Sequence, residues 1–429
     1  MILVRLAFQM KKSGLVWLIA ASAAFATSGA PATERGNSDL LFQGKSIDQM
    51  VVEYMREKKI PGLSVAIVQA PYITRITGYG YSDTGRKLLG ASRTLFQIGQ
   101  MAEAYTAVAV LQLVEDGKVK LDDPIEQHVP LTPAPWHGVT VRQLLQHQSG
   151  LPDYTKATPK NPGDPPAQLF QAVAEQGPVF PPGSQYAQSA TDYLLLQLLV
   201  ETASGQSYES FVRARQFDRL GLKETFFAGE IPQLPRDLPE GGEKPRKFLQ
   251  EAVFINPMEP ATGYRDDELK PVALSDALFR AAIYASASDI SIWDIALAGD
   301  LLLKNADLKK LIFTPAGIKT DIPTSGPWRF PGRPGLMIAS GSTDGFSSIL
   351  CRFTDPKDLL CVTILANREG VDLEHLALQI AGAYDPALGP KSKPTPAATP
   401  TPAASPTSAP TKSTATPAPK PSSTPSPTP

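Results

Sequence analysis

The sequence lacks an excess of charge of either sign. Its 41 Lys and Arg residues against 42 Asp and Glu give a formal net charge of −1, which provides no basic face for nucleic acid. Seven of the basic residues and none of the acidic ones lie in residues 1–26 and 390–429. The remaining 34 basic and 42 acidic residues make the central part mildly acidic, which favours solubility without identifying a partner.

Histidine is scarce, and its four copies have no metal-binding spacing. His128, His137, His147 and His375 are scattered along the chain, and no dinucleotide or phosphate-loop motif is present. We therefore expect no metal and no cofactor. We interpret His147 as an architectural residue and the other three as surface residues.

Long apolar runs are also missing. Residues 13–26 form an apolar and small-residue stretch of 14 residues, which is shorter than the ~20 residues that a spanning helix needs. This stretch follows three positive charges and ends in Ala24-Phe25-Ala26, a pattern typical of a secretory signal peptide. We predict that residues 1–26 are a signal peptide, with an uncleaved anchor as the alternative. No later segment resembles a transmembrane span, and we expect an extracytoplasmic protein in the periplasm, at the cell surface or secreted.

The C-terminal segment has almost no residues that could build a core. Residues 390–429 contain 13 Pro, no aromatic residue and no aliphatic residue larger than Ala. Such a segment cannot bury enough apolar surface to offset the entropy of ordering. We predict a disordered, extended tail that serves either as a solvated spacer or as a wall-associated or glycosylated stalk.

Cysteine is limited to Cys351 and Cys361, in the stretch SSILCRFTDPKDLLCVTILAN. Two apolar runs around a turn-rich TDPKD predict a hairpin, and a turn centred near Pro356 would place the two thiols opposite each other on one face. A disulfide between them in an oxidising compartment is one interpretation. Two buried thiols in a core sheet explain the residues equally well.

Hydrophobic periodicity outlines the central region. Helical spacing appears at residues 47–58, 101–116, 139–147, 190–204, 275–303 and 371–383, and strand-like runs at 63–70, 73–83 and 336–366. Strands at both ends with helices between them predict an α/β fold: a mixed sheet flanked by helices plus a mainly helical domain. We place the folded domain at 27–389, with its α/β part at about 46–95 and 336–385 and its helical part at about 96–335. A ligand cleft is expected at their boundary.

Several stretches in this order resemble one known family. They include TLFQIGQMAEAYTAVAVLQLVEDGKVKLDDPI, TVRQLLQHQSGLPDY, FPPGSQYAQSATDYLLLQLLVE, ATGY, AAIYASASDISIW and DGFSSILCRF. The chain resembles the serine β-lactamase and DD-peptidase superfamily, in its class C β-lactamase and esterase-like branch, from about Ile47 to Ala383. The resemblance implies a β-lactamase/transpeptidase-like fold with an active-site groove between the two parts.

The chemistry of that family depends on an F-x-I-G-S-x-x-K stretch, which supplies a nucleophilic Ser at a helix start and a Lys one turn later. The matching stretch here is FQIGQMAE, so Gln100 stands at the Ser position and Glu103 at the Lys position. A carboxamide nitrogen is essentially non-nucleophilic. The resemblance therefore implies that acyl transfer from this position is absent.

The other two family motifs are degenerate as well. A Tyr-x-Asn triplet after a Pro-Gly turn is replaced by Gln188-Ser189-Ala190. A His-x-Gly or Lys-Thr-Gly triplet, whose cation helps to bind the substrate carboxylate, is replaced by Ala339-Ser340-Gly341. Loss of one member of a coupled catalytic set costs several orders of magnitude in rate. We interpret the chain as an exported pseudoenzyme with no catalytic residues, which uses the old cleft to bind a cell-wall peptide, another small molecule or a protein partner.

Glu103 has two interpretations. It could act as a general base in a displaced hydrolytic mechanism, an esterase, amidase or peptidase, which is the alternative function. The preferred interpretation is structural: a Glu in the first helical turn complements the helix dipole, and no second carboxylate or His is identifiable beside it by motif. One hypothesis is that Gln100 and Gln188 hydrogen-bond with Glu103, which would form either a fixed polar network or a pocket that reads a ligand. Ser189, Ser340, Gly341 and the family landmark Tyr264 complete the predicted ligand cleft.

Overall fold

The computed structural model describes residues 40–70, 72–157, 165–233, 258–272, 282–315, 325–333, 335–355 and 359–390. The predicted signal peptide and the tail from residue 391 onward lie outside the described residues, so both stay predictions. The first residues of the predicted 275–303 helix also lie outside them.

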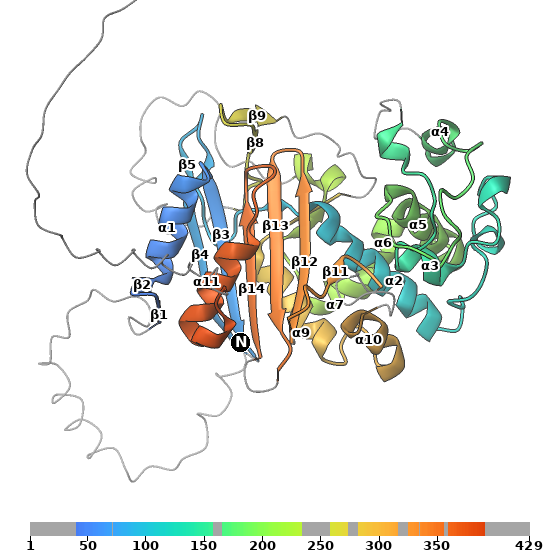
Figure 1. Ribbon diagram of the computed structural model, residues 1–429. Helices are drawn as coiled ribbons and strands as arrows, with labels where there is room; N and C mark the ends of the chain where they lie inside the picture. The colour runs from blue at the N-terminus through green and yellow to red at the C-terminus, as the bar shows by residue number, and fades with distance from the viewer. Residues whose placement is uncertain are drawn as a thin grey trace, which may run out of the picture. The chain divides into compact units, whose positions relative to one another are not determined.

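A seven-stranded sheet joins the two ends of the described chain (Figure 1). Its neighbours are all antiparallel and follow the order β11-β12-β13-β14-β3-β4-β5. The strands are β11 (Trp328–Arg329), β12 (Leu336–Thr343), β13 (Phe346–Phe353), β14 (Leu360–Ala366), β3 (Gly62–Gln69), β4 (Tyr72–Asp83) and β5 (Leu88–Leu89). Because β14 pairs directly with β3, the predicted N- and C-terminal strand regions form one sheet.

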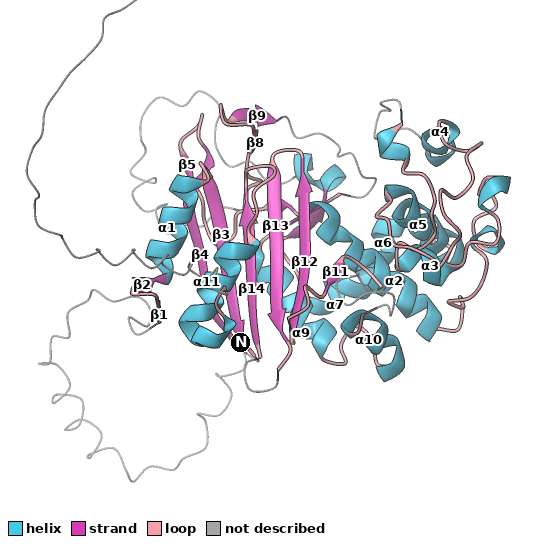
Figure 2. Cartoon of the chain, viewed as in Figure 1, coloured by secondary structure: helices cyan, strands magenta, loops and turns pink. Residues whose placement is uncertain are grey.

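Two helices cover one face of this sheet, α1 (Ile47–Glu57) and α11 (Glu374–Tyr384), as Figure 2 shows. Ser46 begins α1 with a capping box that also uses Gln49. The apolar residues of α1 are buried against alternate residues of the central strands, which form one of two separate cores. The helical spacing expected at 47–58 and 371–383 is therefore confirmed.

The other face carries the larger core and the helical region. Helix α9 (Ala287–Ala298) packs on β3 and β14, while α2 (Glu103–Glu115), α3 (Val141–Leu145) and α5 (Ala190–Ser204) lie beside the β11 end of the sheet (Figure 1). Helix α2 is buried on nearly every side, which explains why most of its residues are apolar. Shorter helices are α4 (Pro166–Gln171), α6 (Tyr208–Val212), α7 (Asp218–Leu220) and α10 (Ala306–Phe313).

Short strands interrupt the region whose sequence predicts mainly helix. Strand β10 (Ile283–Ala285) lies between β6 (Phe96–Gln97) and β7 (Thr225–Phe227), and Ser286 then caps α9. The prediction of one helix over 275–303 is wrong here, because periodicity cannot distinguish a three-residue buried strand from the helix that follows it. The other short strands are β1 (Leu41–Phe42), β2 (Lys45–Ser46), β8 (Gly263–Arg265) and β9 (Lys270–Val272).

The predicted hairpin of β13 and β14 is present, but its register separates the cysteines. Cys351 is paired with Val362, and Arg352 with Cys361. A shift of one residue turns a side chain to the opposite face of a sheet, so the two thiols belong to different cores. Both cysteines are free and buried, and the predicted face-to-face placement for a disulfide is wrong.

Helices long and apolar enough to cross a membrane are absent from the described part of the chain.

Candidate functional site

Two glycines bring the start of α2 against β12. Gly99 opens a 3₁₀ turn (Gly99–Ala102) with φ +55°, and a Cβ added there would lie 3.1 Å from the backbone nitrogen of Ser342. A Cβ on Gly341 would lie 2.2 Å from the carbonyl oxygen of Ile98 and 2.9 Å from the nitrogen of Gln100. This close approach requires residues without a side chain. The predicted first and third motifs therefore meet in space.

Gln100 uses its side chain to bridge this contact. Its Oε1 accepts a hydrogen bond of 2.7 Å from the backbone N–H of Ser342 on β12. The side chain is half-buried at the start of the helix. A backbone N–H that faces a helix start is the kind of donor that stabilises an oxyanion in acyl-transfer enzymes. In this chain a neutral carboxamide oxygen already occupies that donor.

Glu103 lies one helical turn after Gln100, at the start of α2, and has a different partner. Its side chain is 9% exposed, and its Oε2 lies 3.3 Å from Nε2 of His147. Among the described residues, neither Gln100 nor Gln188 donates a hydrogen bond to Glu103, so the hypothesis of a network formed by these three side chains is wrong. The competing partner is a buried imidazole, which a carboxylate prefers to a neutral amide.

His147 connects two carboxylates. Its Nδ1 lies 3.0 Å from Oδ2 of Asp192, and the other Asp192 oxygen accepts a 2.5 Å hydrogen bond from Oγ of Ser149. His147 follows the end of α3 with φ +50°, and Asp192 lies in the first turn of α5. Nδ1 also lies 3.4 Å from the backbone nitrogen of Ser189, which donates to this ring nitrogen when it carries no proton. The carboxylates on both sides of the ring favour a proton on both nitrogens and hence a cationic imidazole. The three groups form a buried chain from Glu103 through His147 to Asp192.

The charged groups of Glu103, His147 and Asp192 shift one another's pKa values. Burial opposes the charged imidazole, but the carboxylates of Glu103 and Asp192 outweigh that effect and raise the pKa of His147 to about 10. Burial raises the pKa of Asp192 to about 6, although the hydrogen bonds from His147 and Ser149 act in the opposite direction. Tyr186 and Tyr193 lie near the same carboxylates, and burial raises the pKa of both phenols. The site is a folded ionic network rather than a free base.

Glu103 lies in the first turn of α2, as its structural interpretation expects, and it also contacts a buried His that no motif identifies beside it. His147 is buried between two carboxylates, an arrangement that agrees with its architectural interpretation. Glu103 and His147 are 44 positions apart, and Asp192 follows after another 45 positions. No spacing motif connects them. The available signal is indirect: all three lie at the ends of helices that the sequence predicts, beside the segments that carry the family resemblance.

A cavity of about 30 Å³ lies next to this network. Side chains from α2, α5, β6 and β10 line it. Ala190, from the second degenerate triplet, contributes to its wall together with Gln100 and Glu103. Among the described residues, no group of His, Cys, Asp and Glu side chains is arranged to hold a metal ion.

Comparison with known proteins identifies the family of the chain. The family model described as Beta-lactamase matches residues 47–385. The chain belongs to the β-lactamase family. The resemblance that the sequence motifs suggest is thus confirmed, and so is the α/β fold class.

Individual relatives in this family are distant. Penicillin-binding protein 4* of Bacillus subtilis (strain 168) is 26% identical over 337 residues, which cover 75% of this chain and 71% of the relative. Protein flp of Staphylococcus aureus (strain MW2) is 28% identical over 189 residues, and the match spans only 38% of its length and 43% of this chain.

Solved structures share the fold. The octameric penicillin-binding protein homologue from Pyrococcus abyssi superposes with a TM-score of 0.64 at 23% identity, covering 80% of this chain and 76% of that chain. FmtA from Staphylococcus aureus superposes with a TM-score of 0.60 at 21% identity, covering 78% of this chain and 88% of that chain. These similarities extend over most of the β-lactamase family domain.

The remaining site residues expected from the β-lactamase family motifs lie at different depths. Gln188 is exposed just before α5, whereas Ser189 is buried and its Oγ has no hydrogen-bond partner in the described structure. On β12, Ser340 is exposed and Gly341 is half-buried, but Ala339 is 1% exposed and belongs to the larger core. The structure therefore brings Ala190, but not Ala339, to the cavity.

Tyr264 lies away from the cavity. Its side chain on β8 is 2% exposed, and its hydroxyl accepts a 2.7 Å hydrogen bond from the backbone N–H of Thr84 and lies 2.8 Å from that residue's Oγ1. It is not among the residues that line the cavity. In the described structure this aromatic residue connects β8 to the turn after β4.

Proposed function

We propose that this β-lactamase family member is an exported pseudoenzyme that binds a ligand in its cleft without forming an acyl intermediate. The observation that carries the proposal is the Gln100 carboxamide, which stands at the nucleophile position and accepts the hydrogen bond from the Ser342 N–H. Covalent catalysis needs a nucleophile and a base in contact with it. Here the helix start offers a neutral amide that is already hydrogen-bonded to the opposite strand.

The group one turn later supports the same proposal. Where the family motif has a Lys, Glu103 is buried and hydrogen-bonded to His147. The proton-transfer and substrate-orienting positions of the second motif are also occupied by Gln188 and Ala190, which cannot perform those roles. Retention of the fold together with these losses favours binding over turnover.

The ligand class follows from the relatives by analogy. Penicillin-binding protein 4* and the penicillin-binding protein homologue are named for penicillin binding. We infer that the cleft takes a cell-wall peptide or a related small molecule, although a protein partner is compatible with the same surface. The predicted signal peptide supports an extracytoplasmic location for this binding.

A direct test uses the purified chain without residues 1–26. It is incubated with a fluorescent penicillin and with a nitrophenyl ester, beside a heat-denatured sample and an active serine β-lactamase. We expect no covalent adduct and no turnover above the denatured control, together with thermal stabilisation by a cell-wall fragment from a screened set. An acyl adduct on any residue overturns the proposal.

One observation favours a second candidate, a hydrolase with a displaced mechanism. The cavity beside Glu103 has room for a water molecule, and a carboxylate next to water can act as a general base. If turnover is found, E103Q distinguishes the two functions. Loss of turnover in this variant supports the hydrolase, whereas unchanged turnover assigns the activity to another group or to a contaminant.

A further inference from the structure

The cavity between α2 and α5 combines one carboxylate with neutral and apolar walls. Its volume of about 30 Å³ exceeds the roughly 10–15 Å³ that a water-sized group needs. Glu103 and Gln97 contribute polar atoms, while Ala190, Leu194 and Ile283 contribute apolar surface. The cavity thus has room for a compact polar head, and its apolar side chains would contact the carbon atoms next to that head.

The network behind Glu103 carries an unbalanced negative charge. Glu103 and Asp192 are two carboxylates, and His147 between them supplies one positive charge because both of its ring nitrogens face carboxylate oxygens. No Lys or Arg of the described residues forms an ion pair with either carboxylate. One negative charge therefore remains in a buried place, where an uncompensated charge is costly.

The unsatisfied charge faces the cavity. His147 approaches Oε2 of Glu103, and Oε1 has no hydrogen bond to any described residue. Glu103 itself lines the cavity, whereas Asp192 is fully buried and already accepts hydrogen bonds at both oxygens. A cation can therefore reach the network through Oε1 of Glu103.

A second polar group in the wall has no partner. Gln97 on β6 is 2% exposed and lines the same cavity, but its carboxamide makes no hydrogen bond to the described part of the chain. Buried amides are normally hydrogen-bonded, and an exception calls for an explanation. A ligand that donates hydrogen bonds would satisfy both Glu103 and Gln97.

We propose that this cavity binds a primary ammonium group at the end of an unbranched alkyl chain, with Glu103 and Gln97 as its polar partners. An ammonium group has three donors and one positive charge in a water-sized volume, whereas a guanidinium is a planar fork of larger extent. The apolar wall packs against the methylene groups. This inference rests on the proposed non-covalent use of the cleft and names the chemical class of the ligand.

Isothermal titration calorimetry of the purified chain at constant ionic strength tests the proposal. The probes are n-butylammonium chloride, n-butanol as its neutral analogue, and tetramethylammonium chloride as a cation without N–H donors. We expect n-butylammonium to bind more tightly than both other probes by about tenfold or more, since hydrogen bonds to charged groups are the strong ones. Equal binding of the three probes, or none, overturns the proposal.

Variants locate the binding. E103Q removes the negative charge but leaves the pair of His147 and Asp192 balanced, so it is expected to fold and to lose about tenfold in n-butylammonium affinity. Q97L keeps the carboxylate and is expected to bind severalfold more weakly. The control is E57Q, because Glu57 lies at the exposed end of α1 and pairs only with Lys58 among the described residues. An unchanged affinity in E103Q places binding elsewhere and contradicts the proposal.

The fluorescent penicillin assay on the same sample separates the two proposals. An acyl adduct overturns the proposed function whatever the calorimetry shows. Absence of an adduct together with equal binding of n-butylammonium and n-butanol leaves the proposed function standing and overturns the ammonium site alone.

Discussion

Residue 103 is a Glu where the family motif has a Lys, so its charge has the opposite sign, and the buried His147 lies against it. The imidazolium contacts Glu103 on one side and Asp192 on the other. Without it, two carboxylates would be buried with no counterion. The buried carboxylates of this chain therefore depend on a residue that the family motif alone presents as part of the scaffold.

Replacing His147 by Gln tests this dependence. A Gln side chain carries no charge, so H147Q leaves both carboxylates unpaired, and breaking a buried ion pair costs about 3–5 kcal/mol. We expect this loss in the free energy of unfolding by urea at about pH 7.5. The loss should be smaller at about pH 4, because the carboxylates then take up protons.

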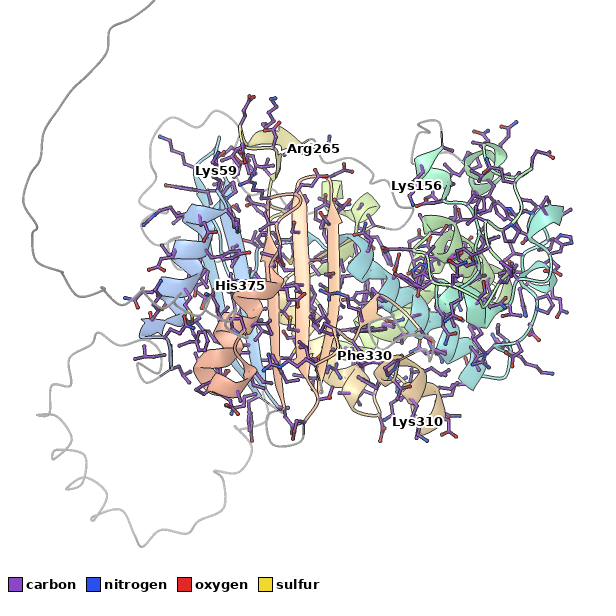
Figure 3. All side chains as sticks on the ribbon, viewed as in Figure 1. Lys59, Lys156, Arg265, Lys310, Phe330 and His375 are labelled. Atoms are coloured by element: carbon purple, nitrogen blue, oxygen red, sulfur yellow. The ribbon has the colours of Figure 1, made fainter. Side chains whose placement is uncertain are left out.

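A matched control is H375Q, because His375 is an exposed residue on α11, on the opposite side of the sheet (Figure 3). Circular dichroism during urea unfolding measures both variants under the same conditions. Equal stability of H147Q and H375Q at about pH 7.5 would show that the imidazolium does not stabilise the network.

Restoring the first motif should not restore an enzyme. Q100S/E103K supplies the family's nucleophile and cation, but the second and third motifs still lack their functional groups at Gln188, Ala190 and Ala339. The ammonium group introduced by E103K would also face the His147 cation, with only Asp192 to neutralise both. We expect no nitrophenyl ester turnover above the unmodified chain and a lower thermal midpoint. Robust hydrolysis by the double variant would contradict this reasoning.

At the scale of elements, the sequence predicts those helices and strands that are long enough to show a hydrophobic period. The buried residues of α1 recur at helical spacing, and β3 is a short apolar run, so the sequence alone identifies both. It does not identify strand β10, because three residues before the Ser286 cap are too few to show a period.

In the candidate site, too, the sequence predicts some features and not others. Gln100 and Glu103 follow from their place in a linear motif, whereas the contact of Glu103 with His147 depends on how α2, α3 and α5 pack. Packing between distant helices leaves no spacing pattern in one sequence. The Cys351 register shows the same limit on a smaller scale, since the position of a turn must be known to within one residue to assign a face.

The observed register of β13 and β14 predicts two free thiols. Cys351 and Cys361 are paired with Val362 and Arg352 rather than with each other. Burial raises the pKa of both thiols, which further suppresses their reaction in the folded chain. In a thiol titration of the unreduced protein with a maleimide, we expect no rapid reaction in the native state and two reactive thiols after denaturation. Fewer than one thiol in the denatured sample would restore the disulfide interpretation.

On the scale of the whole molecule, buried ionisable groups in both hydrophobic cores and in the ionic network make stability sensitive to alkali. The pKa of His147 is raised to about 10 from an ordinary value of 6.5, so its contribution is complete below pH 6.5 and is lost as the pH rises through 10. Burial also raises the pKa of Tyr105 and Cys351, and these groups act in the same direction above their ordinary values of 10 and 9.

We therefore expect the free energy of unfolding to fall continuously as the pH is raised from about 7 to about 10, with each coupled proton contributing a slope of at most about 1.4 kcal/mol per pH unit. Urea midpoints at a series of pH values measure this dependence. H147Q should flatten the slope below about pH 9, where Tyr and Cys titrate little, but leave the steeper loss at higher pH. Parallel pH profiles of the unmodified chain and H147Q across this range would show that the imidazolium is not the source of the alkaline sensitivity. The positive charge assigned to His147, on which the ammonium site depends, would then have to be revised.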